Sequence, residues 1–139
     1  MRFVVDVSAV RYLVARGAGL ARGCALLAPT LLRSQLLSVL HEAVQAGEIA
    51  AEVGRAQLAA ANRMPIRLLG DAVLRRRAWE LADELGWAQT YAAEYLALTQ
   101  LQADAFVTLD TALAKRARAV VKVASIQEIL TRPPPPRAR

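Results

Sequence analysis

Two stretches of the chain decide its fold, RFVVD at residues 2–6 and AFVTLD at residues 105–110. Each is a short run of aromatic and β-branched residues, which is typical of a buried strand. Each ends in an aspartate, and helix-favouring sequence follows closely, SAVRYLVARG in the first case and TALAKRARA in the second. Strands that are followed by helices, with no hairpin signal, predict an α/β sandwich around a short parallel sheet.

The rest of the chain divides into further segments of the same kinds. We expect a strand at CALLA, a strand or linker at PIRLL and a last strand at VVKV, which are residues 24–28, 65–69 and 120–123. Apolar spacing and bounding Gly, Pro or Thr residues predict helices over residues 30–46, 48–62, 72–85, 91–102, 111–119 and 125–131. The tail RPPPPRAR, residues 132–139, is expected to be polyproline-II or disordered and to contribute nothing to the core.

The composition limits the class of protein. With 139 residues, of which 55 % are hydrophobic, the chain is long enough for one domain with a core and too short for two. A single cysteine, Cys24, and a single histidine, His41, exclude a disulfide framework and a two-histidine zinc motif. No apolar run reaches the roughly 18 residues of a membrane span, and an acid interrupts MRFVVDVSAV, so this is a poor signal peptide. We expect a soluble, cytoplasmic protein.

The two strand-end aspartates, Asp6 and Asp110, are the candidate functional residues. In a parallel sheet both would lie at the carboxyl edge, outside which α/β proteins bind their ligands. A few carboxylates with water hold Mg²⁺ and leave positions for phosphate oxygens, and such a metal can activate water against a phosphodiester. Together with a net charge of +6, which favours a polyanionic partner, this predicts a metal-dependent nuclease. The alternative is that each aspartate only caps the helix that follows it.

Over residues 1–131 the chain resembles a PIN domain, and specifically the VapC-like toxin ribonucleases of VapBC-type toxin–antitoxin systems. The resemblance lies in four segments and in their order and spacing: VVDVSAV, LLAPTLLRSQLLSVL, TYAAEYLAL and FVTLDTALAKRA. It implies a three-layer α/β/α sandwich and an endoribonuclease that depends on Mg²⁺ or Mn²⁺. It also implies a homodimer and a cognate antitoxin that blocks the active site.

The family's acidic site carries over only in part. The resemblance places its first aspartate on Asp6, with Ser8 as the supporting hydroxyl, and its last on Asp110, with Thr108 beside it. The remaining two acidic positions of the family fall on the residues Gln35 and Ala92.

Three neighbouring acids could substitute only if they reached the same place. Glu94 should point away from Ala92 around the helix, and Glu42 should lie about 10 Å beyond Gln35 along its helix. Asp104 precedes its strand and so should lie at the opposite edge of the sheet. The alanine at position 92, where the resemblance implies an acid, therefore has three possible explanations. It is an engineered inactivation, a natural loss of activity, or a site in which water and substrate phosphates fill the vacant positions around the metal.

Basic and apolar surfaces suggest where partners bind. One basic cluster is Arg75–Arg77, and a second comprises Lys115, Arg116, Arg118 and Lys122. Lys115 and Arg116 lie within about two helical turns of Asp110, so they are the candidates for guiding RNA, although solvated helix faces would look the same. The Ala- and Leu-rich helices over 30–46 and 48–62 present either core or a partner site, such as one for an antitoxin helix. The aromatic residues Trp79, Trp87, Tyr91 and Tyr95 are expected in the core or an interface rather than as base-stacking platforms.

Three functions follow from the sequence. The first is an endoribonuclease toxin with a thinned acidic site. The second is a catalytically dead PIN scaffold that binds antitoxin or RNA without cleaving it. The third is a receiver-like signalling domain. This class requires an acidic pair after the first strand, whereas Asp6 is a single acid between Val5 and Val7, so this function is the least favoured.

Overall fold

The computed structural model describes residues 1–130 and contains one five-stranded sheet in which all pairs are parallel. The strand order is β3-β2-β1-β4-β5. The strands are β1 (Arg2–Val5), β2 (Ala25–Pro29), β3 (Ile66–Leu69), β4 (Ala105–Val107) and β5 (Val123–Ala124). The α/β fold with a parallel sheet that the sequence predicts is therefore confirmed.

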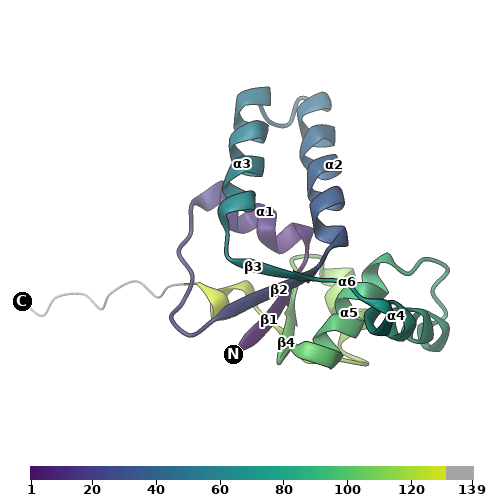
Figure 1. Cartoon of the computed structure of the whole chain (residues 1–139). Coiled ribbons are helices and arrows are strands. Elements are labelled where there is room, and N and C mark those ends of the chain that lie inside the picture. Colours follow the sequence, from purple (N-terminus) through teal and green to yellow (C-terminus); the bar gives the residue numbers. More distant parts are fainter. Residues whose placement is uncertain (131–139) are drawn as a thin grey trace, which may run out of the picture.

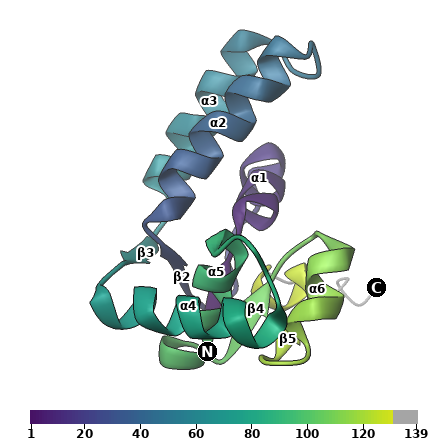
Figure 2. The same cartoon turned by 90° about the vertical axis from the view of Figure 1, so that its right-hand side faces the viewer.

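Helices cover both faces of the sheet and complete a three-layer α/β/α sandwich (Figure 1). The helices are α1 (Val7–Arg16), α2 (Leu31–Gln45), α3 (Ala51–Arg63), α4 (Ala72–Leu85), α5 (Tyr91–Gln102) and α6 (Thr111–Ala117). Helix α5 packs on β1, β2 and β4, and α4 packs on α5. On the other side α1 contacts α2 and α3, which stand side by side and project beyond the sheet (Figure 2).

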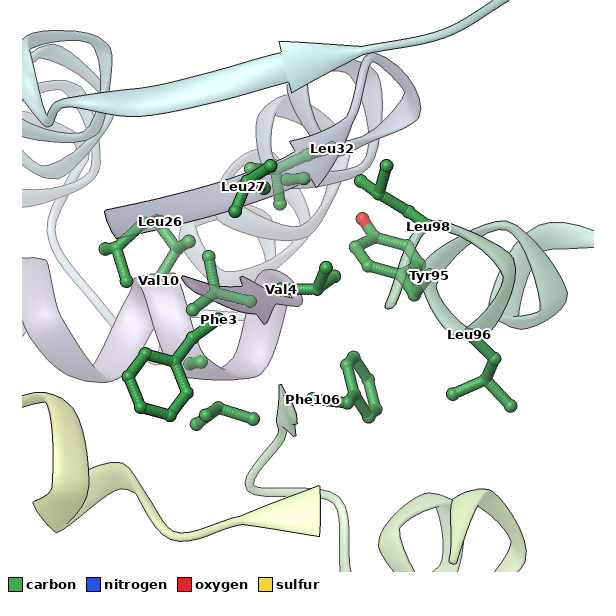
Figure 3. Packing of buried hydrophobic residues seen from close by; sticks show 14 of the residues in the cluster. Phe3, Val4, Val10, Leu26, Leu27, Leu32, Tyr95, Leu96, Leu98 and Phe106 are labelled. Carbon is green, nitrogen blue, oxygen red and sulfur yellow. The ribbon is translucent and has the colours of Figure 1, made fainter. Parts of the chain in front are cut away.

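The central strands are buried on both faces, so their residues form the core (Figure 3). Val4, Val5, Phe106 and Val107 have no exposed surface. A strand that is covered on both faces reads as a continuous apolar run rather than an alternating one. The runs that decide the fold are therefore continuous because helices lie above and below them.

Several element boundaries differ from the sequence prediction. The last strand is Val123–Ala124 rather than residues 120–123, because the amides of Val120 and Val121 both bond to the carbonyl of Ala117 at the end of α6. The final helix is a 3₁₀ turn, Ile126–Ile129, which begins with a capping box of Ser125 and Glu128. Strand β4 stops at Val107, three residues earlier than expected. The predicted tail, residues 132–139, lies outside the described residues.

Gly54 explains how α2 and α3 pack so closely. The sequence tolerates this glycine within a predicted helix, and the structure gives it a role. A Cβ at this position would lie 2.7 Å from Cγ2 of Val44 on α2, which is closer than packed atoms allow. Within residues 1–130, none of these helices has the length and apolar character needed to cross a membrane.

Candidate functional site

The order of the strands reverses direction beside β1. The chain passes from β1 outward to β2 and β3, then returns to place β4 on the other side of β1. In open parallel sheets such a switch point leaves a crevice at the carboxyl ends of the two strands. Asp6 follows the last residue of β1, and Asp110 lies three residues beyond the last residue of β4. The topology therefore brings the two predicted acids to one end of the sheet.

Asp6 is only 8 % exposed, and its carboxylate is held by three hydrogen bonds. Its Oδ1 accepts from the Ser8 hydroxyl at 2.6 Å and from the Ala9 amide at 3.0 Å, and its Oδ2 accepts from the Thr108 hydroxyl at 2.5 Å. Two of these donors are on the following helix and one follows β4. Asp6 therefore ties the end of β1 to the end of β4.

The same hydroxyls hold the segment that leads to Asp110. Because Ser8 and Thr108 each donate their one proton to Asp6, their oxygens are left to accept hydrogen bonds. The Leu109 amide donates to Ser8 Oγ at 2.9 Å, and the Asp110 amide donates to Thr108 Oγ1 at 3.1 Å. Thr108 thus supports Asp6 through its proton and Asp110 through its oxygen, whereas its sequence position suggests only the second role.

Both aspartates cap helices, as the simpler interpretation of the sequence holds. Asp6 Oδ1 caps α1 through the Ala9 amide, and Asp110 Oδ1 caps α6 through the Leu113 amide at 3.0 Å. Capping occupies only one oxygen of each carboxylate. The Oδ2 atom of Asp110 has no partner within residues 1–130, and the Oδ2 atom of Asp6 bonds only to Thr108.

A hollow of about 470 Å³ opens beside Asp6 and contains the two positions at which the resemblance expects further acids. Gln35 reaches it from α2 and Ala92 from the first turn of α5. Asp110 does not line this hollow, but Leu113, whose amide it caps, does. The remaining lining residues are Val7, Ser38, Val39, Gln89, Tyr91 and Tyr95. We refer to this space below as the hollow.

Tyr95 is a member of the site that sequence reasoning assigned only to the core or an interface. Its ring is buried, and its hydroxyl donates to Gln35 Oε1 at 2.6 Å. Burial, with smaller contributions from the charges of Asp6 and Glu94, raises the pKa of the Tyr95 hydroxyl far above its usual range. The sequence does contain a signal for this role, because a buried tyrosine in an apolar helix needs a hydrogen-bond partner for its hydroxyl. Gln35 carries no negative charge; its Oε1 accepts this bond, and its amide group offers the hollow a donor.

The neighbouring acids do not replace the missing ones. Partial burial raises the pKa of the Glu94 carboxyl, and the nearby charge of Arg75 offsets only part of this rise. Asp104 accepts from the Arg2 amide at 2.7 Å, at the amino ends of β1 and β4, and Glu42 accepts from the Ser38 hydroxyl at 3.2 Å. None of the three lines the hollow. Within residues 1–130 no three or more His, Cys, Asp or Glu side chains gather as a metal-binding group.

The two basic clusters differ in how far their charges are already paired. Arg77 donates to Glu80, Glu84 and Gln100 at 3.1, 3.1 and 2.8 Å. Lys115 and Arg116 are exposed on α6 and form no salt bridge within the described residues. The Arg116 guanidinium lies 5.8 Å from the centre of the Trp87 ring, near enough for a cation–π contact. Arg75 and Arg76 are also exposed and form no salt bridge within the described residues, so Arg77 is the residue of the two clusters whose charge is already paired there.

Comparisons with known proteins agree with the fold. No protein-family model and no curated protein sequence matches the chain. Among solved structures, the crystal structure of PAE2754 from Pyrobaculum aerophilum is similar, with a TM-score of 0.69 and 19 % sequence identity. The match covers 91 % of this chain and 90 % of that chain. At this level of identity the likeness establishes a shared fold.

Proposed function

We propose that this protein is a metal-dependent endoribonuclease of the VapC-like PIN toxin type, with an acidic site reduced to Asp6 and Asp110. The observation that carries the proposal is the convergence of four residues at the switch point, Asp6, Ser8, Thr108 and Asp110, through one hydrogen-bond network. The resemblance of the sequence to that family and the net charge of +6 support it.

The donor set at the strand ends fits a hard divalent cation such as Mg²⁺ or Mn²⁺. Magnesium is commonly held by one or two carboxylates together with waters and substrate phosphates. Asp6 and Asp110 would hold it through their Oδ2 atoms, because their Oδ1 atoms cap helices. When bound, the ion would polarise the phosphodiester and lower the pKa of water. Two carboxylates attract a cation less strongly than four, so we expect weak binding.

The protein's own groups would orient the reaction. Ser8 and Thr108 hold the Asp6 carboxylate in one orientation, so its free lone pair has a fixed direction. The Gln35 amide can donate to a phosphate oxygen of RNA, and the basic residues Lys115 and Arg116 would draw the RNA backbone toward the site. As partners we propose an RNA substrate, a cognate antitoxin and a second copy of the chain, in the cytoplasm.

Gln35 and Ala92 favour a second function, that of a PIN scaffold which binds RNA or antitoxin without cleavage. At both positions the hollow lacks the carboxylate that the resemblance expects. A scaffold of this kind would keep its fold and its basic surface, but it would hold no metal at working concentrations.

Cleavage of a labelled RNA in Mg²⁺ or Mn²⁺ separates the two functions. An active enzyme cuts RNA with the metal and stops in EDTA, and Asp6→Asn abolishes cutting while keeping a side-chain oxygen to cap α1. Ala92→Asp should raise both metal affinity and cleavage. If the Ala92→Asp protein is folded but neither binds Mg²⁺ nor cuts any RNA, the nuclease proposal is wrong. If only the original chain is inactive, it is the non-cleaving scaffold.

A further inference from the structure

Tyr91 is an exposed aromatic residue at the wall of the hollow. It is the first residue of α5, it lines the hollow together with Asp6, and it is 53 % exposed. Its side chain makes no hydrogen bond and no ring contact with any residue from 1 to 130. About half of this residue therefore remains in water, which is unfavourable for an apolar ring surface.

The other aromatic residues that could serve as a platform are already occupied or lie elsewhere. Tyr95 packs against Phe106 with ring centres 6.3 Å apart, and Trp87 faces the guanidinium of Arg116. Trp79 is 68 % exposed, but it lies on α4 and does not line the hollow. Tyr91 is therefore the exposed ring adjacent to the proposed reaction site, and Trp79 is an exposed ring outside it.

We propose that Tyr91 stacks on an unpaired base and so selects single-stranded RNA for the hollow. This inference rests on the proposed function and takes up the alternative to our prediction from sequence, which favoured the core or an interface over base stacking for this tyrosine. Stacking needs a base with a free face, which a duplex does not present at an inner position. A tyrosine ring stacks on any base, so the contact selects for strandedness and leaves sequence preference to other groups.

The surroundings of Tyr91 provide partners for the adjoining backbone. Thr90, the N-cap residue of α5, makes no side-chain capping bond, so the first amides of this helix are left for an acceptor near the hollow. Gln35 adds an amide donor, and Lys115 and Arg116 add positive charge in the last turn of α6, the helix that Asp110 caps. A base on Tyr91 with its phosphate toward these donors would lie beside Asp6.

Binding can be measured without cleavage, by fluorescence anisotropy of a labelled single-stranded RNA in EDTA. Because stacking on an aromatic ring contributes about 1–3 kcal/mol per base, Tyr91→Ala should raise the Kd about 5- to 150-fold. Tyr91→Phe keeps the ring and should stay within about twofold of the original chain. The matched control is Trp79→Ala, which removes an exposed ring outside the hollow and should leave the Kd unchanged. A duplex of the same sequence should bind more weakly, and a DNA strand shows whether the 2′-hydroxyl contributes.

The inference is overturned if Tyr91→Ala binds the single strand as tightly as the original chain, or if the duplex binds as well as the single strand. It is also overturned if Tyr91→Ala changes the oligomeric state in size-exclusion chromatography, since Tyr91 would then be an interface residue. Binding in EDTA does not require a metal at the acidic site. A chain that binds single-stranded RNA through Tyr91 but never cleaves it would refute the nuclease and retain the stacking contact.

Discussion

The two halves of the candidate site are built in different ways. The strand-end half, Asp6, Ser8, Thr108 and Asp110, is joined by hydrogen bonds to backbone amides, and both acids cap helices. The helical half, Gln35, Ala92 and Tyr95, reaches the hollow from α2 and α5 and contains no acid. Residues 35 and 92 have no capping role, so the fold needs no acid at either position. The strand-end acids, in contrast, serve the fold as well as the proposed site.

Replacing the two aspartates by alanine tests this difference most strongly. Asp6→Ala removes a cap and leaves the Ser8 and Thr108 hydroxyls without their acceptor, so the free energy of unfolding should fall by about 3 kcal/mol. Asp110 is exposed and makes one capping bond. Asp110→Ala should therefore cost about 1 kcal/mol. Urea denaturation at pH 7 measures both values.

Asp6→Asn provides the control, because an amide oxygen can still cap α1 while the charge is lost. Its stability should fall between those of the original chain and Asp6→Ala. If the two alanine variants lose equal free energy of unfolding, Asp6 contributes no more to the fold than Asp110 does, and the larger structural role inferred for Asp6 is wrong.

Adding charge to the helical half should have the next largest effect. Gln35→Glu combined with Ala92→Asp brings two more carboxylates to the hollow, and we expect Mn²⁺ affinity to rise at least about tenfold. Without metal the added like charges should lower the melting temperature. With Mn²⁺ the variant should recover stability by linkage, whereas the original chain should respond little. Isothermal titration calorimetry measures the Mn²⁺ affinity, and thermal unfolding with and without Mn²⁺ measures the change in melting temperature. An unchanged affinity would mean that residues 35 and 92 do not contact the metal.

The strand-end half could be predicted from sequence, and the helical half could not be fully described. Buried parallel strands read directly as apolar runs, so Asp6 and Asp110 stand out where those runs stop. The order β3-β2-β1-β4-β5, which makes the space beside β1 a crevice, is a long-range property that no local pattern records. The bond from Tyr95 to Gln35 joins residues 60 positions apart. Periodicity could place Tyr95 on a packed face, but it could not show where its hydroxyl points, nor that Tyr91, four residues earlier, is exposed.

Tyr95→Phe tests the helical half through its pH dependence. At pH 7 the variant should lose about 1 kcal/mol of stability, because the hydrogen bond to Gln35 is removed. The folded protein keeps Tyr95 protonated well above the usual pKa, whereas the unfolded chain ionises it near pH 10. Stability of the original chain should therefore carry an extra decrease above pH 10, of up to about 1.4 kcal/mol per pH unit, which the phenylalanine variant lacks. Urea unfolding at pH 7, 9.5 and 11 should show the gap between the two proteins narrowing at high pH.

The smallest expected effect concerns the basic residues, which lie on two different helices. Lys115 and Arg116 lie on α6, the helix that Asp110 caps, whereas Arg77 lies on α4 and is already paired with Glu80 and Glu84. Removing both Lys115 and Arg116 should weaken binding of single-stranded RNA several-fold at moderate salt. It should also reduce the slope of log Kd against log salt by about 1.4, since each phosphate contact on a single strand contributes about 0.7.

Arg77→Ala is the matched control for this pair of residues. Its partners already neutralise the Arg77 charge, so we expect the salt slope to stay unchanged and the free energy of unfolding to fall by at most about 1 kcal/mol. Anisotropy titrations at four salt concentrations distinguish the two surfaces. If Arg77→Ala lowers the slope as much as the double variant does, RNA approaches over α4. The basic residues of α4 would then contribute to RNA binding in place of those on α6.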